Sequence, residues 1–387
     1  MRGRIQLAAR RGLATAAAAI FLSGCSSLPS LPFFGGGAEK PKPAELQPNP
    51  ATLGIRSGWT SRIGPVAFPL EAHVSGRQLA LASSDGTVAM LDAATGRDLW
   101  RASVGANIAA GVGSDGSTAA VVTTANELVA LEGGRVLWRQ KLPAQAFTAP
   151  LVAGKRVFVL AADRSVSAFD GATGRPLWTQ SRPGEPLVLR QAGVLLAVGD
   201  TLVAGQGGRL AGLNPLNGSV RWEAPIATPR GTNDVERLVD LVAPVSRVGN
   251  SVCTRAYQAA IGCVDASRGT LAWTRPARGT EGVGGDERLV VGTESDDRIV
   301  AWRRDNGERA WVHDKLLHRG LTAPLVVGSS VVVGDGTGLL HVLSREDGSL
   351  RNRVATDGSA LAAAPVVAGS TLVAVTRNGG IYAFVPQ

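Results

Sequence analysis

One repeat constrains the fold of this chain more than any other feature. In six places a glycine is followed four residues later by a tryptophan: Gly96/Trp100, Gly134/Trp138, Gly174/Trp178, Gly218/Trp222, Gly269/Trp273 and Gly307/Trp311. A seventh glycine, Gly348, has Asn352 at the tryptophan position. Successive glycines lie 38, 40, 44, 51, 38 and 41 residues apart. A period of about 40 residues with several short strands per unit is typical of β-propeller blades.

Each repeat carries the signals of four short strands. Aliphatic runs such as 157–160, 331–333 and 372–375 favour β-strands. Glycine-containing turns, for example Asp85-Gly86, separate the second strand from the third, and the repeated Thr-Gly pairs suit a tight turn before the fourth. The pattern therefore predicts an all-β chain.

The two ends of the chain decide the number of blades. The chain ends soon after an eighth third strand at 381–384, so the last blade lacks its outer strand. A spare strand around Trp59 lies at the other end of the repeats. We expect this N-terminal strand to complete the last blade and close the ring, because closure removes two open sheet edges. The prediction is an eight-bladed β-propeller over residues 53–387, with four antiparallel strands per blade; seven blades is the alternative count.

The first 52 residues have a different character. Residues 1–24 have the basic start and short apolar stretch (14–22) of a signal peptide, and that stretch is too short to span a bilayer. Leu22-Ser23-Gly24-Cys25 resembles the lipobox of bacterial lipoproteins, which implies lipidation of Cys25; a chance cysteine is the alternative. Residues 25–52 are rich in proline and glycine and are predicted to form a flexible tether.

The tryptophan repeats are similar to those of quinoprotein dehydrogenase-like propellers. Together with the lipobox, the tether and the eight blades, they make the chain resemble the BamB family of lipoproteins. The resemblance implies a non-catalytic scaffold subunit of the β-barrel assembly (BAM) complex, anchored to the outer membrane and facing the periplasm. It also implies binding to the POTRA domains of BamA, to other BAM subunits and to nascent outer-membrane β-barrel proteins, without a cofactor.

Two segments resemble the family's BamA-binding residues. Leu187, Leu189 and Arg190 match a Leu-x-Leu-Arg segment, and Asp240 matches one acid of a second segment, whereas Val242 stands where the family often has another acid. Independently, the two longest glycine intervals place extra residues after Trp178 and Trp222, in connections on one face of adjacent blades. Clustered insertions often mark the binding face of a repeat protein. The alternatives are neutral loop drift, leucines that belong to an inner-strand core, and an arginine that only faces solvent.

Two further sets of residues carry structural predictions. We expect seven tryptophans to pack between adjacent blades: Trp59, Trp100, Trp138, Trp178, Trp222, Trp273 and Trp311. Cys253 and Cys263 lie on neighbouring strands of one blade, where an oxidising compartment permits a disulfide. A two-residue turn would place Cys253 opposite Val264, so the disulfide needs a bulge or a longer loop, and two buried thiols remain the alternative.

The sequence motifs predict no enzyme, metal or cofactor. The Gly-x-Gly-x-x-Gly match at 111–116 precedes a strand-like run instead of a helix, which argues against a dinucleotide site. The four histidines lack metal-ligand spacing. The formal charge is +9, yet Lys and Arg form no cluster, which argues against nucleic acid. The alternative functions are a pyrroloquinoline-quinone dehydrogenase, which would need larger insertions, and an envelope scaffold or adhesin.

Overall fold

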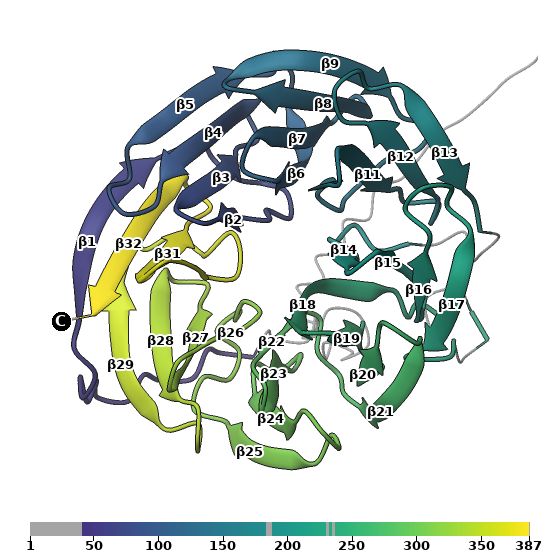
Figure 1. Cartoon of the computed structure of the whole chain (residues 1–387). Coiled ribbons are helices and arrows are strands. Elements are labelled where there is room, and N and C mark those ends of the chain that lie inside the picture. Colours follow the sequence, from purple (N-terminus) through teal and green to yellow (C-terminus); the bar gives the residue numbers. More distant parts are fainter. Residues whose placement is uncertain (1–40, 183–187, 230–231, 234–236, 387) are drawn as a thin grey trace, which may run out of the picture. The chain divides into compact units, whose positions relative to one another are not determined.

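The computed structural model describes residues 41–182, 188–229, 232–233 and 237–386. Within these ranges, residues 42–386 belong to one compact unit and hold eight four-stranded antiparallel sheets. Figure 1 shows the sheets arranged as blades around a ring, with the first strand of each blade at the centre. The predicted all-β, eight-bladed propeller is therefore confirmed, and the count of seven is wrong.

Blades 1 to 4 are built, in order, from β2 (His73–Ser75), β3 (Gln78–Ala82), β4 (Thr87–Asp92) and β5 (Asp98–Ser103); β6 (Ile108–Ser114), β7 (Thr118–Thr123), β8 (Glu127–Glu132) and β9 (Arg135–Lys141); β10 (Leu151–Ala153), β11 (Arg156–Leu160), β12 (Val166–Asp170) and β13 (Pro176–Gln180); β14 (Leu195–Val198), β15 (Thr201–Gln206), β16 (Arg209–Leu213) and β17 (Val220–Pro225).

Blades 5 to 8 are built from β18 (Leu241–Val248), β19 (Ser251–Ala256), β20 (Ala260–Asp265) and β21 (Thr270–Pro276); β22 (Val283–Gly285), β23 (Leu289–Thr293), β24 (Ile299–Arg303) and β25 (Arg309–His313); β26 (Leu325–Val327), β27 (Ser330–Gly334), β28 (Leu339–Ser344) and β29 (Leu350–Ala355); β30 (Val366–Ala368), β31 (Thr371–Val375), β32 (Gly380–Pro386) and β1 (Ile55–Arg62).

The N-terminal strand closes the ring, as predicted. β1 is the outer strand of blade 8 and runs antiparallel to β32, with Thr60 opposite Tyr382. The second and third strands of the blades are almost wholly buried, and their aliphatic side chains form the core between blades. This arrangement gives blade 8 the same four strands as the other blades and leaves the outer strands at the rim.

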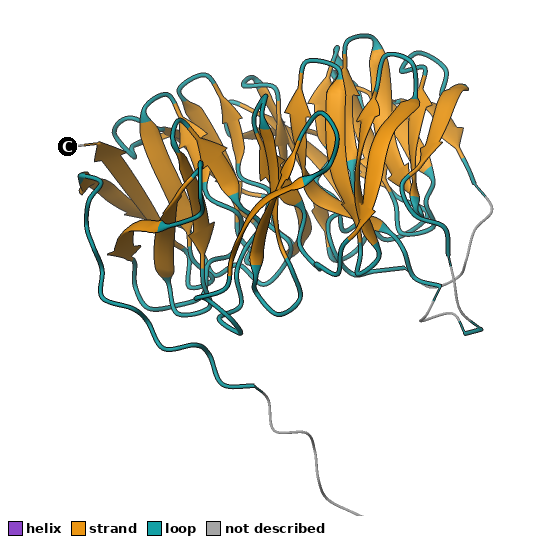
Figure 2. Cartoon of the chain, turned by 90° about the horizontal axis from the view of Figure 1, so that it is seen from below, coloured by secondary structure: helices purple, strands orange, loops and turns teal. Residues whose placement is uncertain are grey.

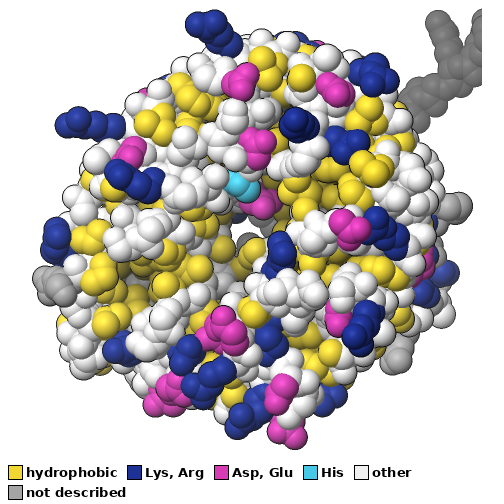
Figure 3. All heavy atoms as spheres, viewed as in Figure 1, with side chains coloured by type: hydrophobic (Ala, Val, Ile, Leu, Met, Phe, Trp, Pro, Cys, Tyr) yellow, Lys and Arg dark blue, Asp and Glu magenta, His cyan; other side chains and the backbone are white. Residues whose placement is uncertain are grey.

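Because each blade has four antiparallel strands, its connections alternate between the two faces of the ring. The turn between the second and third strands lies on the same face as the connection to the next blade. We call this the connection face; it is the lower side in Figure 2, where the N-terminal segment leaves the ring. The opposite face carries the remaining turns. Figure 3 shows an opening at the centre of the ring, and basic side chains interspersed with acidic ones around the face in view.

The repeated tryptophans lie against the glycine turn of the following blade. A Cβ atom added to Gly174 would lie 2.5 Å from Trp138, and the Trp138 indole Nε1 donates to the Gly171 carbonyl at 2.8 Å. Two constraints require glycine at this turn. Its φ of +72° is one that other residues rarely adopt, and the indole leaves no room for a Cβ atom. Similar contacts join the other tryptophan and glycine pairs: Trp59 with Gly96, Trp100 with Gly134, Trp178 with Gly218, Trp222 with Gly269, Trp273 with Gly307 and Trp311 with Gly348.

Ring closure explains why Asn352 replaces a tryptophan in blade 7. Blade 8 has no turn between its third and outer strands, because β32 and β1 come from opposite ends of the chain. An indole on β29 would therefore find no glycine turn to cover. Instead, the Asn352 amide Nδ2 donates to the Leu53 carbonyl at 2.6 Å and its Oδ1 accepts from Asn49 at 3.1 Å. The exception in the repeat is thus tied to the entry of the N-terminal segment.

The ring binds part of the segment that the sequence assigns to the tether. The Ala44 amide donates to the Leu317 carbonyl at 2.8 Å, and Arg319 donates to the Ala44 carbonyl at 3.1 Å. Farther along, the Thr52 amide donates to the Arg351 carbonyl at 2.8 Å. The part of the chain held by the ring therefore begins before residue 53, because blades 6 and 7 supply partners for the backbone of this segment.

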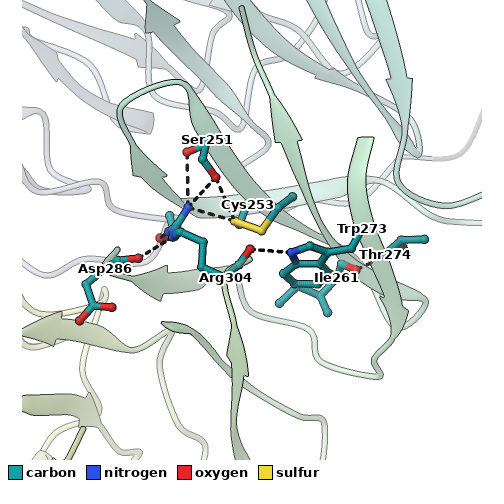
Figure 4. Close-up of a disulfide and its surroundings, with 9 residues drawn as sticks. Ser251, Cys253, Ile261, Trp273, Thr274, Asp286 and Arg304 are labelled. Carbon is teal, nitrogen blue, oxygen red and sulfur yellow. Dashed lines mark hydrogen bonds between the residues drawn. A yellow bond between two sulfur atoms is a disulfide. The ribbon is translucent and has the colours of Figure 1, made fainter. Parts of the chain in front are cut away.

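The structure contains a disulfide between Cys253 and Cys263, which lie directly opposite each other on β19 and β20. The loop between the paired residues Ala256 and Ala260 has three residues. This length places Cys253 opposite Cys263, whereas a two-residue turn would place it opposite Val264. Figure 4 shows the disulfide at the seam with blade 6, where Arg304 Nη1 lies 3.1 Å from Cys253 Sγ and the Trp273 indole donates to the Arg304 carbonyl at 2.7 Å. Both cysteines are fully buried.

No helix in the described part of the chain is long and apolar enough to cross a membrane.

Candidate functional site

The extra residues that follow Trp178 and Trp222 lie in neighbouring connections on the connection face. The first connection joins β13 to β14, and its described part includes residues 188–193, which we call the docking loop. The second joins β17 to β18 and ends with Asp240. Neither Leu189 nor Arg190 belongs to a strand. The structure therefore places these residues outside the inner-strand core, contrary to the alternative interpretation of Leu189.

Asp240 ties the two connections together. Its Oδ2 accepts a hydrogen bond from the Leu189 backbone amide at 3.1 Å. Its Oδ1 accepts from Nη2 of Arg164 at 3.1 Å, and the two side chains are only 16% and 11% exposed. Arg164 lies in the turn between β11 and β12, so one carboxylate connects blade 3, the docking loop and the start of blade 5.

Arg190 is the exposed end of this arrangement. Its guanidinium lies over the Phe147 ring, 5.6 Å from the centroid, and its side chain faces solvent. Stacking on an aromatic face orients a guanidinium without using its hydrogen-bond donors. Arg190 therefore presents a fixed positive fork that suits a carboxylate or a backbone carbonyl of another protein.

The next residues anchor the docking loop at its other end. The Gln191 side-chain amide donates to the Thr280 carbonyl at 2.8 Å, at the entrance to blade 6. The Gly193 amide donates to the Thr148 hydroxyl at 2.9 Å. The same Gln191 amide lies 3.5 Å from Glu281, a carboxyl whose pKa is raised by burial although Arg377 and Arg255 oppose the shift. The docking loop is thus held by contacts to the entrances of blades 3, 5 and 6.

Leu189 is half-buried and lines two cavities. A small cavity of about 50 Å³ is lined by Leu189, Phe147, Leu160 and Asp240. A second, open cavity of about 780 Å³ is lined by Leu189, Leu238, Ile226 and Tyr257, among others. The apolar side chain of Leu189 therefore borders a hollow surface of blades 4 and 5 large enough to receive side chains of another protein.

The structure gives Asp240 partners that the sequence pattern did not indicate. Its carboxylate contacts the Arg164 guanidinium and the Leu189 backbone amide. Arg164 was missed, because an arginine in a turn of another blade carries no signal at the sequence level. Val242, at the position of the family's second acid, is 1% exposed, so an acid there would be buried.

The remaining predicted site residues are distributed as follows. Cys25 and Leu187 lie outside the described residues. The seven tryptophans and the two cysteines lie at seams between blades or within a blade, away from the docking loop. Leu189, Arg190 and Asp240 are the predicted binding residues that the structure brings together, and we call them the candidate docking surface.

Comparisons with known proteins point to one family. A family model described as "Outer membrane protein assembly factor BamB" matches residues 84–313 and 315–386. A Burkholderia pseudomallei protein with that name is 35% identical over 384 residues, covering 97% of this chain and 97% of that protein. A Bordetella pertussis protein with the same name is 33% identical and covers 96% of both chains.

Solved structures share the fold. The crystal structure of BamB from Moraxella catarrhalis has a TM-score of 0.78 at 23% identity, and covers 86% of this chain and 99% of that one. Quinohemoprotein alcohol dehydrogenase from Comamonas testosteroni has a TM-score of 0.64 at 14% identity, and covers 88% of this chain and 78% of that one. At these identities the likeness concerns the fold alone, which assembly factors and enzymes share.

Proposed function

The chain belongs to the BamB family of outer membrane protein assembly factors, and we propose that it serves as a non-catalytic lipoprotein scaffold of the BAM complex. It binds the periplasmic POTRA domains of BamA and assists the folding and insertion of outer-membrane β-barrel proteins. Other BAM subunits and nascent barrel proteins are its further partners. Residues 1–24 are removed as a signal peptide, and the chain from Cys25 to the ring anchors it to the periplasmic side of the outer membrane.

One observation carries the assignment of the binding site. Exposed Arg190 and half-buried Leu189 lie side by side on a loop whose backbone is held by the Asp240 carboxylate, beside an open hollow. An apolar side chain next to an oriented arginine is the kind of pair that dominates protein–protein interfaces. No specific observation favours the enzyme alternative, because the likeness to quinohemoprotein dehydrogenases concerns the fold alone.

The Arg190→Ala variant tests the site. Arg190 is exposed and stacks on Phe147, so its truncation should leave folding intact. Binding to the BamA POTRA domains should weaken by about 2 kcal/mol or more, roughly a 30-fold rise in Kd. Titration calorimetry and a melting curve on the same preparation measure both quantities.

A matched control is Arg298→Ala, which removes an arginine of 52% side-chain exposure from a turn on the same face of blade 6. Its affinity should equal that of the parent. If Arg190→Ala binds as tightly as the parent, Arg190 does not belong to the site. If the parent protein is purified from membranes and no BAM subunit accompanies it, an envelope scaffold or adhesin is favoured instead.

Lipidation is tested separately. Protein extracted from membranes with detergent should have an intact mass that corresponds to a chain beginning at Cys25 and carrying acyl chains, since several acyl chains give stable anchoring. A soluble periplasmic product with a free Cys25 thiol would refute the anchor without touching the proposed docking site.

A further inference from the structure

A residue of blade 3, Arg164, contacts the candidate docking surface from a neighbouring turn. Arg164 lies at the tip of the turn between β11 and β12, one blade before the docking loop begins blade 4. Its guanidinium contacts the Asp240 carboxylate through Nη2 at 3.1 Å and Nε at 3.4 Å. The other oxygen of that carboxylate accepts the Leu189 amide at 3.1 Å. Arg164 is thereby connected to Leu189 through one shared group.

The backbone of Arg164 provides a second, independent observation. Its φ is +64°, in the left-handed region that side chains with a Cβ rarely adopt. The corresponding turn of blade 1 has Gly86, and that of blade 2 has Asn126, two residue types that adopt this conformation more readily. Local strain of this kind persists where the surrounding structure or a function requires the side chain.

We infer that Arg164 is a positioning residue of the docking surface: it holds the Asp240 carboxylate, which fixes the Leu189 backbone and so presents Leu189 and Arg190 before BamA arrives. This inference rests on the proposed function. Its physical basis is that a loop ordered in advance loses less conformational entropy on binding. The Asp240 carboxylate alone would be free to rotate away from the Leu189 amide, whereas the guanidinium fork restrains it.

The test uses the full-length protein with Arg164→Gly. Glycine relieves the left-handed strain but leaves the largely buried Asp240 carboxylate without its guanidinium partner, so the melting temperature should fall while the ring stays folded at the temperature of the assay. Without any partner, hydrogen exchange of the Leu189 amide should accelerate about tenfold, since its acceptor is no longer held. The Kd for the BamA POTRA domains should rise about tenfold.

Three further variants make the result specific. Asn126→Gly makes the same backbone change in blade 2 and should alter neither Leu189 exchange nor BamA affinity. Arg164→Lys keeps the charge but loses the fork, so both readouts should fall between those of the parent and Arg164→Gly. In the double variant Arg164→Gly with Asp240→Asn, the loss of affinity should be smaller than the sum of the two single losses, because both changes disrupt the contact between these residues.

The outcomes separate the inference from the proposed function. Unchanged exchange at Leu189 in Arg164→Gly overturns the positioning role. Faster exchange with unchanged BamA affinity, when Arg190→Ala does weaken binding, overturns the link to docking and leaves the proposed function standing. A parent protein that does not bind the POTRA domains overturns the proposed function, and the docking part of the inference falls with it, while Leu189 exchange still decides the positioning part.

Discussion

Replacing Trp138 with alanine is expected to lower the free energy of unfolding by about 3–5 kcal/mol, the range for a buried aromatic side chain replaced by alanine. The indole is 8% exposed, covers the turn at Gly174 and packs against Phe169 with ring centroids 6.4 Å apart. Its loss opens a cavity between blades 2 and 3 and leaves the Gly171 carbonyl without the indole donor. Urea unfolding followed by intrinsic fluorescence or circular dichroism measures the change.

The neighbouring Leu137 gives a control on the same strand. Leu137 is 41% exposed, so Leu137→Ala should change the free energy of unfolding by no more than about 0.5 kcal/mol. If Trp138→Ala unfolds at the same urea concentration as the parent, the blade tryptophans do not hold adjacent blades together. In that case they would have to be examined as interface residues.

Asp335→Asn is expected to have an effect of similar size, about 3–5 kcal/mol, because it removes one partner of a buried charged pair. The Asp335 carboxylate is fully buried and accepts from Arg319 at 2.9 Å and from His341 Nε2 at 3.0 Å. Arg319 and Arg353 in turn donate to the Ala44 and Gln47 carbonyls at 3.1 Å. The variant should therefore also accelerate hydrogen exchange or proteolysis around residues 44–53.

Acid should weaken the same cluster in the parent protein. Burial lowers the pKa of His341 from its ordinary 6.5, although the bond to Asp335 opposes the shift. Burial alone would raise the pKa of Asp335, but hydrogen bonds from His341, Leu339 and Thr337 outweigh it and hold the pKa far below the ordinary 3.8. Both groups bind protons more readily in the unfolded chain, so stability falls as the pH drops below 6.5 and falls again below 3.8.

The measurement is urea unfolding of the parent and Asp335→Asn from pH 7.5 down to about pH 2. The variant should be less stable at neutral pH and should lack the part of the acid loss that begins below pH 3.8, because residue 335 no longer titrates. Asp347→Asn, an exposed aspartate in another turn of the same blade, should behave as the parent. A pH profile of Asp335→Asn that parallels the parent would show that the cluster does not control acid stability.

The architecture of the ring can be predicted from local sequence patterns. The period of the glycine and tryptophan pairs, the turn signals and the spare strand around Trp59 predicted eight blades and their closure by β1. These features are readable because they are local: strand periodicity, turn residues and a glycine that must adopt positive φ act within a few positions of the chain. The unequal glycine intervals also placed the docking loop and Asp240 in neighbouring connections on one face.

The contacts between side chains of different blades depend on the folded ring. Arg164 and Asp240 are separated by 76 residues, and Leu189 and Asp240 by 51, so no local sequence pattern predicts their contacts. The same holds for Asn352, whose departure from the repeat makes sense once blade 8 is seen to lack a turn between β32 and β1. A strand is specified by its own residues, but the partner of a side chain at a blade end depends on how successive blades are rotated around the ring, and that rotation is set by packing of the whole core.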